Sequence, residues 1–259
     1  MERIFITGHS GLVGREVIKQ LNETENKTYL FKSSELDLRN EIEDKKILDQ
    51  IKSCKIVIHC ASIAHNTDKD PYAENIKIMK NLLRACTNDQ RFIFLSTIDL
   101  NYYHLIKHLK NPQNFLFRYI KSKYECERLL RKFGFSSYLI ARLAPFCSED
   151  SDYDLQKRVF FPGQKFFKMR MIPEVTYFIS NKKSVSEIIN KSLFFKNKSK
   201  STEEFGFFIS QKEILKNYNG FSLPLYWIPI LYCLNNVLIK KIEILLLFKI
   251  FSLKLFGHK

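Results

Sequence analysis

The sequence predicts an α/β fold in which parallel strands and helices alternate in a doubly wound sheet, with a small lobe at the C-terminal end. Three observations carry this prediction. A short apolar run leads into a turn with Gly8, Gly11 and Gly14, and a helical pattern follows at once. Further apolar runs alternate with helical patterns up to residue 143. The chain has 259 residues, 45% of them hydrophobic, which is enough for one large core.

Each expected element rests on its own pattern. Helices are expected where apolar residues recur every three or four positions, and strands where short apolar runs are rich in β-branched and aromatic residues. The run 55–62 is apolar and ends in small residues, as a buried parallel strand can. The expected strands are 4–7, 28–31, 55–62, 91–95 and 136–143, and the expected helices are 14–21, 42–51, 74–86 and 117–130.

The glycine turn predicts a dinucleotide site of the Rossmann type. Glycine has no Cβ and tolerates positive φ, so the backbone can approach a diphosphate, while the N-terminus of the next helix offers free N–H groups. An ordinary strand-to-helix turn is the alternative. The residues expected to hold the cofactor here are Gly8, Ser10, Gly11, Leu12, Val13, Gly14 and Arg15.

The pattern Thr7-Gly8-x-x-Gly11-x-x-Gly14 resembles the extended short-chain dehydrogenase/reductase family, the NAD(P)-dependent sugar-nucleotide epimerases, dehydratases and reductases. That family has a Tyr-x-x-x-Lys pair on a later helix, preceded by a strand ending in Ser or Thr. Tyr119 and Lys123 lie one turn apart on the expected helix 117–130, and Thr97 ends the strand before it. A solvated Tyr and Lys on a surface helix is the alternative for an isolated pair.

The resemblance covers roughly residues 1–147 and implies a role for each residue of this trio. Tyr119 would transfer the proton, and Lys123 would support its phenolate and contact the nicotinamide ribose. Thr97 would hold the reacting oxygen. Beyond Thr97 the chain departs from the family, since 98–102 replaces the usual approach to Val-Tyr-Gly, and Asp99 lies one place off the Thr-Asp pair of a 4,6-dehydratase.

The cofactor is expected to be NADP(H), with NAD(H) as the alternative. Lys32 follows the second strand at the position where an acidic residue would select the ribose of NAD, and Arg15 adds a second cation. Asp37, followed by Leu38, matches the family position that meets the adenine amino group. The equal alternative is that Asp37 caps the helix 42–51.

Small residues after the strand 55–62 complete the expected cofactor site. Cys60, Ala61 and Ser62 leave room for a ligand at the carboxyl edge of the sheet. His59, just before them, is expected to be a packed core histidine rather than a catalyst. Asn75 matches a family asparagine with a structural role near the active site.

The implied function is a reductase or epimerase at C4 of a nucleotide-linked hexose, in the synthesis of surface-polysaccharide precursors. The substrate would be a UDP-, GDP- or dTDP-hexose. The alternative from another class is a non-catalytic NADP-binding regulatory or scaffold protein of the same fold. Residues 1–147 would form the NAD(P)-binding domain, and 148–259 the small substrate lobe with an apolar C-terminal helical segment.

Composition narrows the remaining classes. The six cysteines show no metal spacing and the chain starts without a secretory signal, so a cytoplasmic protein with free thiols and no metal is expected. The net charge of +15 is spread along the chain, which argues against a nucleic-acid partner. The apolar, lysine-rich stretch 222–259 suggests either packing on the lobe or association with an anionic membrane face. The sequence leaves open whether the protein forms a homodimer.

Overall fold

The computed structural model describes residues 2–63, 70–103, 115–147, 166–194 and 199–226. The chain divides into two compact units, one formed by 1–144 and 182–205 and the other by 145–181 and 206–259. The sequence predicts that residues 148–259 all belong to the small lobe. In the structure the chain leaves the first unit near that point but returns to it for 182–205.

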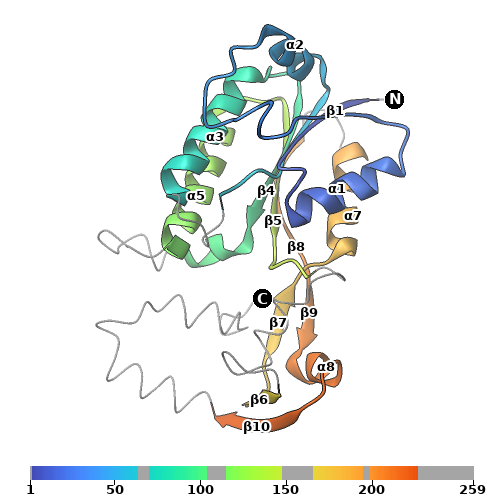
Figure 1. Cartoon of the computed structure of the whole chain (residues 1–259), viewed down its shortest axis with the longest axis vertical. Coiled ribbons are helices and arrows are strands. Elements are labelled where there is room, and N and C mark those ends of the chain that lie inside the picture. The colour runs from blue at the N-terminus through green and yellow to red at the C-terminus, as the bar shows by residue number, and fades with distance from the viewer. Residues whose placement is uncertain (1, 64–69, 104–114, 148–165, 195–198, 227–259) are drawn as a thin grey trace. The chain divides into compact units, whose positions relative to one another are not determined.

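The first unit contains a six-stranded sheet in which every neighbouring pair is parallel, in the order β2-β1-β3-β4-β5-β8 (Figure 1). The predicted doubly wound α/β class is therefore confirmed. The strands are β1 (Arg3–Thr7), β2 (Lys27–Leu30), β3 (Ile56–His59), β4 (Arg91–Thr97), β5 (Ser137–Leu143) and β8 (Lys200–Phe205). The strand expected over 55–62 ends at His59, so the small residues that follow leave the sheet.

Helices cover both faces of this sheet, with α3 and α5 on one side and α1 and α7 on the other (Figure 1). Alternation along the strands feeds both layers: Phe5 and Val57 join the cluster that includes the buried residues of α3, while Ile4 and Ile6 are buried on the opposite face. The helices are α1 (Leu12–Asn22), α2 (Lys45–Ser53), α3 (Pro71–Ala85), α5 (Phe115–Phe133) and α7 (Lys182–Phe194), with a 3₁₀ helix η1 (Ile98–Tyr102) after β4.

The start of α2 decides between the two interpretations of Asp37. The N-cap is Asp44, whose carboxylate accepts hydrogen bonds from the backbone N–H groups of Lys46 and Ile47, at 2.8 and 3.4 Å. The interpretation of Asp37 as the cap of this helix is therefore wrong. Asp44 delays the helix start to Lys45, three residues later than the apolar pattern indicates.

The order of the strands locates a binding crevice. From β1 the chain crosses to β2 on one side and then to β3 on the other side of β1. Ligands of open parallel sheets bind outside the carboxyl ends of the strands at such a reversal. The glycine turn follows β1 directly, so this sheet presents it at the reversal point.

The second unit contains two small sheets. In one, β6 (Phe167–Ile172) pairs in parallel with β10 (Phe221–Tyr226), and in the other β7 (Thr176–Ile179) pairs antiparallel with β9 (Phe207–Ser210). The short helix α8 (Gln211–Lys216) begins with a capping box formed by Ser210 and Glu213. The hydrophobic core of this second unit contains Cys147, Met171, Val175, Tyr177, Ile179 and Ile214.

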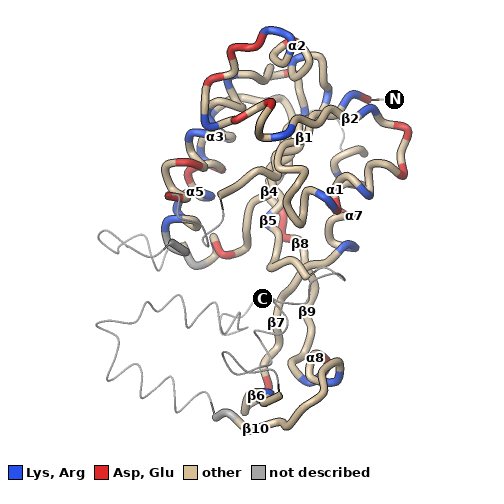
Figure 2. The backbone as a smooth tube through the Cα atoms, in the orientation of Figure 1, with Lys and Arg blue, Asp and Glu red and all other residues tan. Residues whose placement is uncertain are grey.

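The apolar C-terminal stretch begins as a strand, because 222–226 belong to β10. Its remainder, 227–259, lies outside the described residues, so its packing or membrane association stays a prediction. Among the described helices, none is both long and apolar enough to cross a bilayer. Figure 2 shows Lys and Arg mixed with Asp and Glu on the helices of the first unit rather than gathered in one stripe.

Candidate active site

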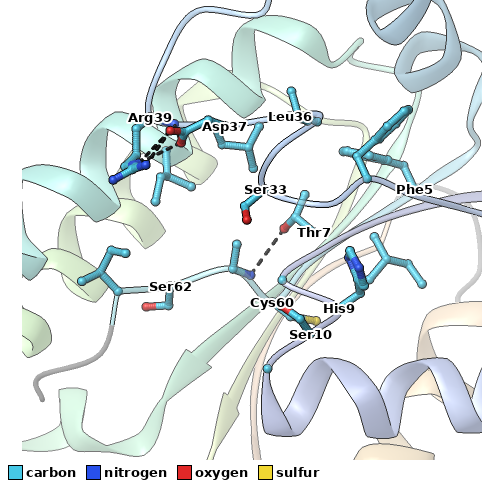
Figure 3. A pocket seen from close by; sticks show the side chains of 18 residues that line it. Phe5, Thr7, His9, Ser10, Ser33, Leu36, Asp37, Arg39, Cys60 and Ser62 are labelled. Atoms are coloured by element: carbon cyan, nitrogen blue, oxygen red, sulfur yellow. Dashed lines mark hydrogen bonds and ion pairs between the residues drawn. The ribbon is translucent and has the colours of Figure 1, made fainter. Parts of the chain in front are cut away.

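A cavity of about 410 Å³ opens where β1 and β3 end. Its walls come from the end of β1, the glycine turn, the loop after β2 and the segment after β3 (Figure 3). The lining residues are Phe5, Ile6, Thr7, Gly8, His9, Ser10, Gly11, Phe31, Ser33, Leu36, Asp37, Leu38, Arg39, Cys60, Ala61, Ser62, Ile63 and Ile78.

The three glycines of the turn serve two purposes. Gly8 has φ +71°, and a Cβ there would lie 2.4 Å from the backbone nitrogen of Ala61. A Cβ on Gly14 would lie 2.1 Å from the carbonyl oxygen of Gly8. These two glycines therefore allow close backbone packing. Gly11 lines the cavity, and a Cβ there would meet Gly8 at an ordinary 3.4 Å, so its missing side chain leaves space for a ligand.

The N-terminus of α1 suits an anion. Gly11 is its N-cap, and within the described residues no side chain caps the helix and no acidic residue occupies its first turn. The first intrahelical bond runs from the N–H of Arg15 to the carbonyl of Gly11, at 2.9 Å. The N–H groups of 12–14 and the positive end of the helix dipole are left for a ligand. A dinucleotide diphosphate fits this donor set and the cradle left by Gly11.

The loop after β2 forms the opposite wall. Asp37 and Arg39 make a bidentate ion pair, with Arg39 Nη2 2.6 Å and Nε 2.8 Å from the two carboxylate oxygens. Among the described residues that line the cavity, Arg39 is the one Lys or Arg. Lys32 is exposed and outside the lining, although its neighbours Phe31 and Ser33 both belong to it. Arg15 also lies outside the lining.

Helix α5 carries the Tyr-Lys pair. Lys123 is buried, and its Nζ donates to the carbonyl of Leu95 on β4 at 2.9 Å and lies 5.7 Å from the centre of the Tyr119 ring. Burial lowers the pKa of Lys123 to about 8. The tie to β4 places this helix beside the strand that ends in Thr97.

Tyr119 is held as the neutral phenol. Burial raises its pKa well above the ordinary value, the Asp99 carboxylate raises it further, and a hydrogen bond with Ser62 opposes them. The expectation that Lys123 and the oxidised nicotinamide together support the phenolate stays a prediction. Among the protein groups, burial has the largest effect on the pKa of Tyr119 and raises it, and the pKa of Lys123 is about 8. Ser62 lines the cavity, and its Oγ donates to Asn75 Oδ1 at 3.4 Å.

Asn75 joins the cavity wall to the catalytic helix. Its Oδ1 accepts from the N–H of Ile63 at 2.7 Å, and its Nδ2 donates to the carbonyl of Ile63 at 3.1 Å and to Ser122 Oγ at 3.0 Å. Ser122 in turn donates to the carbonyl of Tyr119 at 2.6 Å. The side chain of Asn75 is buried and fully paired, so it fixes α3, α5 and the segment after β3 to one another.

A buried carboxylate anchors α5 one turn beyond Lys123. Glu127 is fully buried and accepts hydrogen bonds from Ser96 Oγ at 2.8 Å, from Arg142 Nη2 at 2.9 Å and from Arg131 Nη2 at 2.8 Å. Burial alone would raise the pKa of Glu127, but these hydrogen bonds hold it below its usual value. Glu127 was not predicted from the sequence, although its place one helical turn after Lys123 puts it on the same face of the helix.

Thr97 and Asp99 lie together at the end of β4. The Thr97 hydroxyl oxygen accepts from the N–H of Asp99 at 3.2 Å and caps η1, so its own hydrogen can be donated elsewhere. The departure from the family pattern at 98–102 is thus this 3₁₀ turn.

We expect Asp99→Asn to move the loss of carbonyl-reducing activity at alkaline pH to lower pH. A protonated Tyr119 is needed to donate a proton, and removing the Asp99 charge lowers the pKa of that phenol. The measurement is the more alkaline limb in the pH profile of kcat, since loss of the Lys123 charge near pH 8 gives the first limb, with Asp89→Asn as a control at an exposed carboxylate. An alkaline limb that stays in place would mean that Asp99 does not act on Tyr119.

His59 is confirmed as a core residue. It is buried, it stacks on Phe94 with ring centres 5.5 Å apart, and its Nδ1 lies 2.6 Å from Thr7 Oγ1. Burial lowers its pKa to about 3, so it stays neutral. The adjacent Cys60 lines the cavity, and burial raises the pKa of its thiol to about 12, which leaves it unreactive as a nucleophile.

The structure thus brings part of the predicted site into one cavity. Of the predicted cofactor residues, Gly8, Ser10, Gly11, Asp37, Leu38, Cys60, Ala61 and Ser62 line it. The residues outside the lining are Leu12, Val13, Gly14, Arg15, Lys32, Tyr119 and Lys123. The wall formed by Phe31, Ser33 and Arg39 was not predicted from the sequence. The one residue near it that was predicted to contact the cofactor is Asp37.

The parallel sheet, the glycine turn at its reversal point and the buried Tyr-Lys helix together define an α/β protein of the dinucleotide-binding class. A model of the NAD dependent epimerase/dehydratase family matches residues 4–169. The chain belongs to that family.

Comparisons with individual proteins agree with this assignment. The chain is similar to a sterol-4-alpha-carboxylate 3-dehydrogenase (decarboxylating) of Dictyostelium discoideum, with 28% identity over 118 residues, covering 38% of this chain and 36% of that protein. Among solved structures it resembles a dTDP-4-dehydrorhamnose reductase of Bacillus anthracis in complex with NADP (TM-score 0.63, 19% identity, 87% and 85% of the two chains). It also resembles the UDP-N-acetylglucosamine 4-epimerase of Bacillus cereus (0.65, 17%, 87% and 86%). At these identities the two structures establish the shared fold.

Proposed function

We propose that this protein is an NAD(P)-dependent enzyme that acts at C4 of a nucleotide-linked hexose, as a 4-keto reductase or a 4-epimerase. The observation that carries the proposal is the set of hydrogen bonds made by Asn75, because they join Ile63 in the cavity wall to Ser122 on the helix that carries Tyr119 and Lys123. Of the two solved structures named above, one is by its name a reductase of a dTDP-linked 4-dehydro sugar and the other a 4-epimerase of a UDP-linked sugar.

The cofactor would lie in the cavity. The N–H groups of 12–14 would bind its diphosphate, and Gly11 would leave the room for it. The wall with Asp37 and Leu38 would face its adenosine. When bound, the nicotinamide supplies or accepts the hydride of the reaction.

The remaining chemistry belongs to residues of this chain. Tyr119, kept neutral by burial and by Asp99, would donate a proton to the oxygen of a sugar ketone as that carbon is reduced. Thr97 would hold the same oxygen with its free hydroxyl hydrogen. Lys123, fixed by the carbonyl of Leu95, would keep a positive charge beside the phenol below about pH 8 and stabilise the anion that forms.

A substrate panel tests this proposal. The purified protein would be incubated with UDP-, GDP- and dTDP-hexoses and their 4-keto derivatives, following NADPH absorbance and product identity. A reductase consumes one NADPH for each product, whereas an epimerase converts its substrate without net consumption. Binding of NADPH without turnover of any sugar nucleotide would favour the non-catalytic alternative.

The preference for NADP(H) is a separate proposal. We expect Lys32→Asp to lower the ratio of NADPH to NADH affinity by about tenfold, because the new carboxylate would repel a ribose 2′-phosphate near Ser33. The measurement is the pair of dissociation constants in parent and variant. Lys27→Asp, at the start of the strand that precedes Lys32 and farther along the chain from Ser33, is the matched control. An unchanged ratio would identify Lys32 as a solvated surface residue.

A further inference from the structure

A second buried asparagine on α3 holds the loop that forms the adenosine wall. Asn81 is 6% exposed, and its Nδ2 donates to the carbonyl oxygen of Leu38 at 3.0 Å and to that of Asn40 at 2.9 Å. The Asn81 amide thus donates two hydrogen bonds, one to the carbonyl before Arg39 and one to the carbonyl after it. A buried amide is costly unless it is paired, so this geometry specifies one position of the loop relative to α3.

The loop itself belongs to no helix or strand. Its internal contacts include a turn, in which the N–H of Asn40 donates to the carbonyl of Asp37 at 2.9 Å, a hydrogen bond from the N–H of Arg39 to Asp37 Oδ1 at 3.0 Å, and the ion pair of Asp37 with Arg39. These contacts fix the shape of the loop but not its place in the fold. Leu38, which is buried in the core, and the two hydrogen bonds of Asn81 attach it to the rest of the unit.

A surface contact connects the same two elements. Arg84, one turn after Asn81 on α3, pairs with Glu41 at 2.5 Å, but these side chains are 66% and 73% exposed. An exposed ion pair contributes little, because solvent screens it and two long side chains must be ordered. The chain thus offers a buried tie and an exposed tie between one helix and one loop, which makes the second a natural control for the first.

We propose that Asn81 is a positioning residue for the cofactor, which sets the affinity for its adenosine part by holding Asp37, Leu38 and Arg39 in place. The inference rests on the proposed cofactor site. Asn81 would not contact the cofactor and would not affect the reaction at Tyr119. Asn75, two turns earlier on α3, has the complementary place, since its partners are Ile63 and Ser122 beside the catalytic helix. One helix would then hold both ends of the site through separate side chains.

The test uses ADP-ribose, which contains the adenosine and diphosphate of the cofactor but no nicotinamide. Asn81→Leu and Asn81→Ala remove both donors, one with and one without filling the space. Calorimetry should show the dissociation constants of ADP-ribose and NADPH raised by the same factor, about tenfold, as expected from lost hydrogen bonds of ordinary strength. The kcat at saturating cofactor should stay within about twofold. Arg84→Gln should change neither constant.

Several results would overturn the inference. One is an unchanged affinity for ADP-ribose in a folded Asn81 variant, and another is a lower kcat with unchanged affinity. Insolubility of both Asn81 variants beside a folded Arg84→Gln would also overturn it, since Asn81 would then serve the stability of the fold. Failure of the parent protein to bind either ADP-ribose or NADPH would instead contradict the proposed function.

Discussion

Tyr119→Phe is expected to lower turnover of the sugar-nucleotide substrate by about 10²-fold or more while leaving NADPH affinity nearly unchanged. The substitution removes the only atom that would transfer the proton and keeps the ring that packs beside Lys123. Single-turnover reduction and NADPH titration of the same preparation separate the two effects.

The control for this variant lies on the same helix. Tyr124 stacks on Tyr103 with ring centres 4.1 Å apart and lies outside the cavity lining, so Tyr124→Phe should keep normal turnover. If Tyr119→Phe turned over substrate within twofold of the parent, Tyr119 would not be the proton donor.

Gly14→Ala is expected to lower stability strongly. Its Cβ would lie 2.1 Å from the carbonyl oxygen of Gly8, a backbone atom that cannot turn aside, so α1 must shift from the sheet. Overpacking of this kind costs about 3 kcal/mol. For a chain of this size that corresponds to a fall in Tm of roughly 6–12 °C, measured by thermal unfolding.

Gly11→Ala separates packing from ligand binding in the same turn. Its Cβ would meet protein only at an ordinary contact distance and would point into the space expected for the cofactor. Stability should therefore change little while NADPH affinity falls. Equal Tm values for the Gly14 and Gly11 variants would contradict the different roles given to these glycines.

Local patterns predicted the centre of the fold well. The glycine turn, the strands that flank it and the helix with Tyr119 and Lys123 all have short-range signals, because backbone geometry and helical spacing impose them within a few residues. Their meeting at one cavity follows from the parallel topology, since the carboxyl ends of parallel strands lie at one edge.

The misses have a common physical origin. β8 alternates exposed and partly buried residues at the edge of the sheet, so it lacks an apolar run, and its pairing with β5 is a long-range contact that no local window contains. The environment of Tyr119 was missed for the same reason. Its pKa depends on burial and on Asp99, which come from the packing of η1 and β4 against α5 rather than from the spacing of Tyr and Lys.

The return of the chain to the first unit has a consequence for its synthesis. β8 pairs with β5 along six residues, from Tyr138–Lys200 to Leu143–Phe205, and α7 packs with α1 on the face behind the glycine turn. A nascent chain released only as far as residue 147 would carry all of the proposed catalytic residues but would expose the edge of β5 and one side of α1. The ribosome must therefore translate past residue 205 before the cofactor-binding unit can close, and until then its open sheet edge is a target for chaperones.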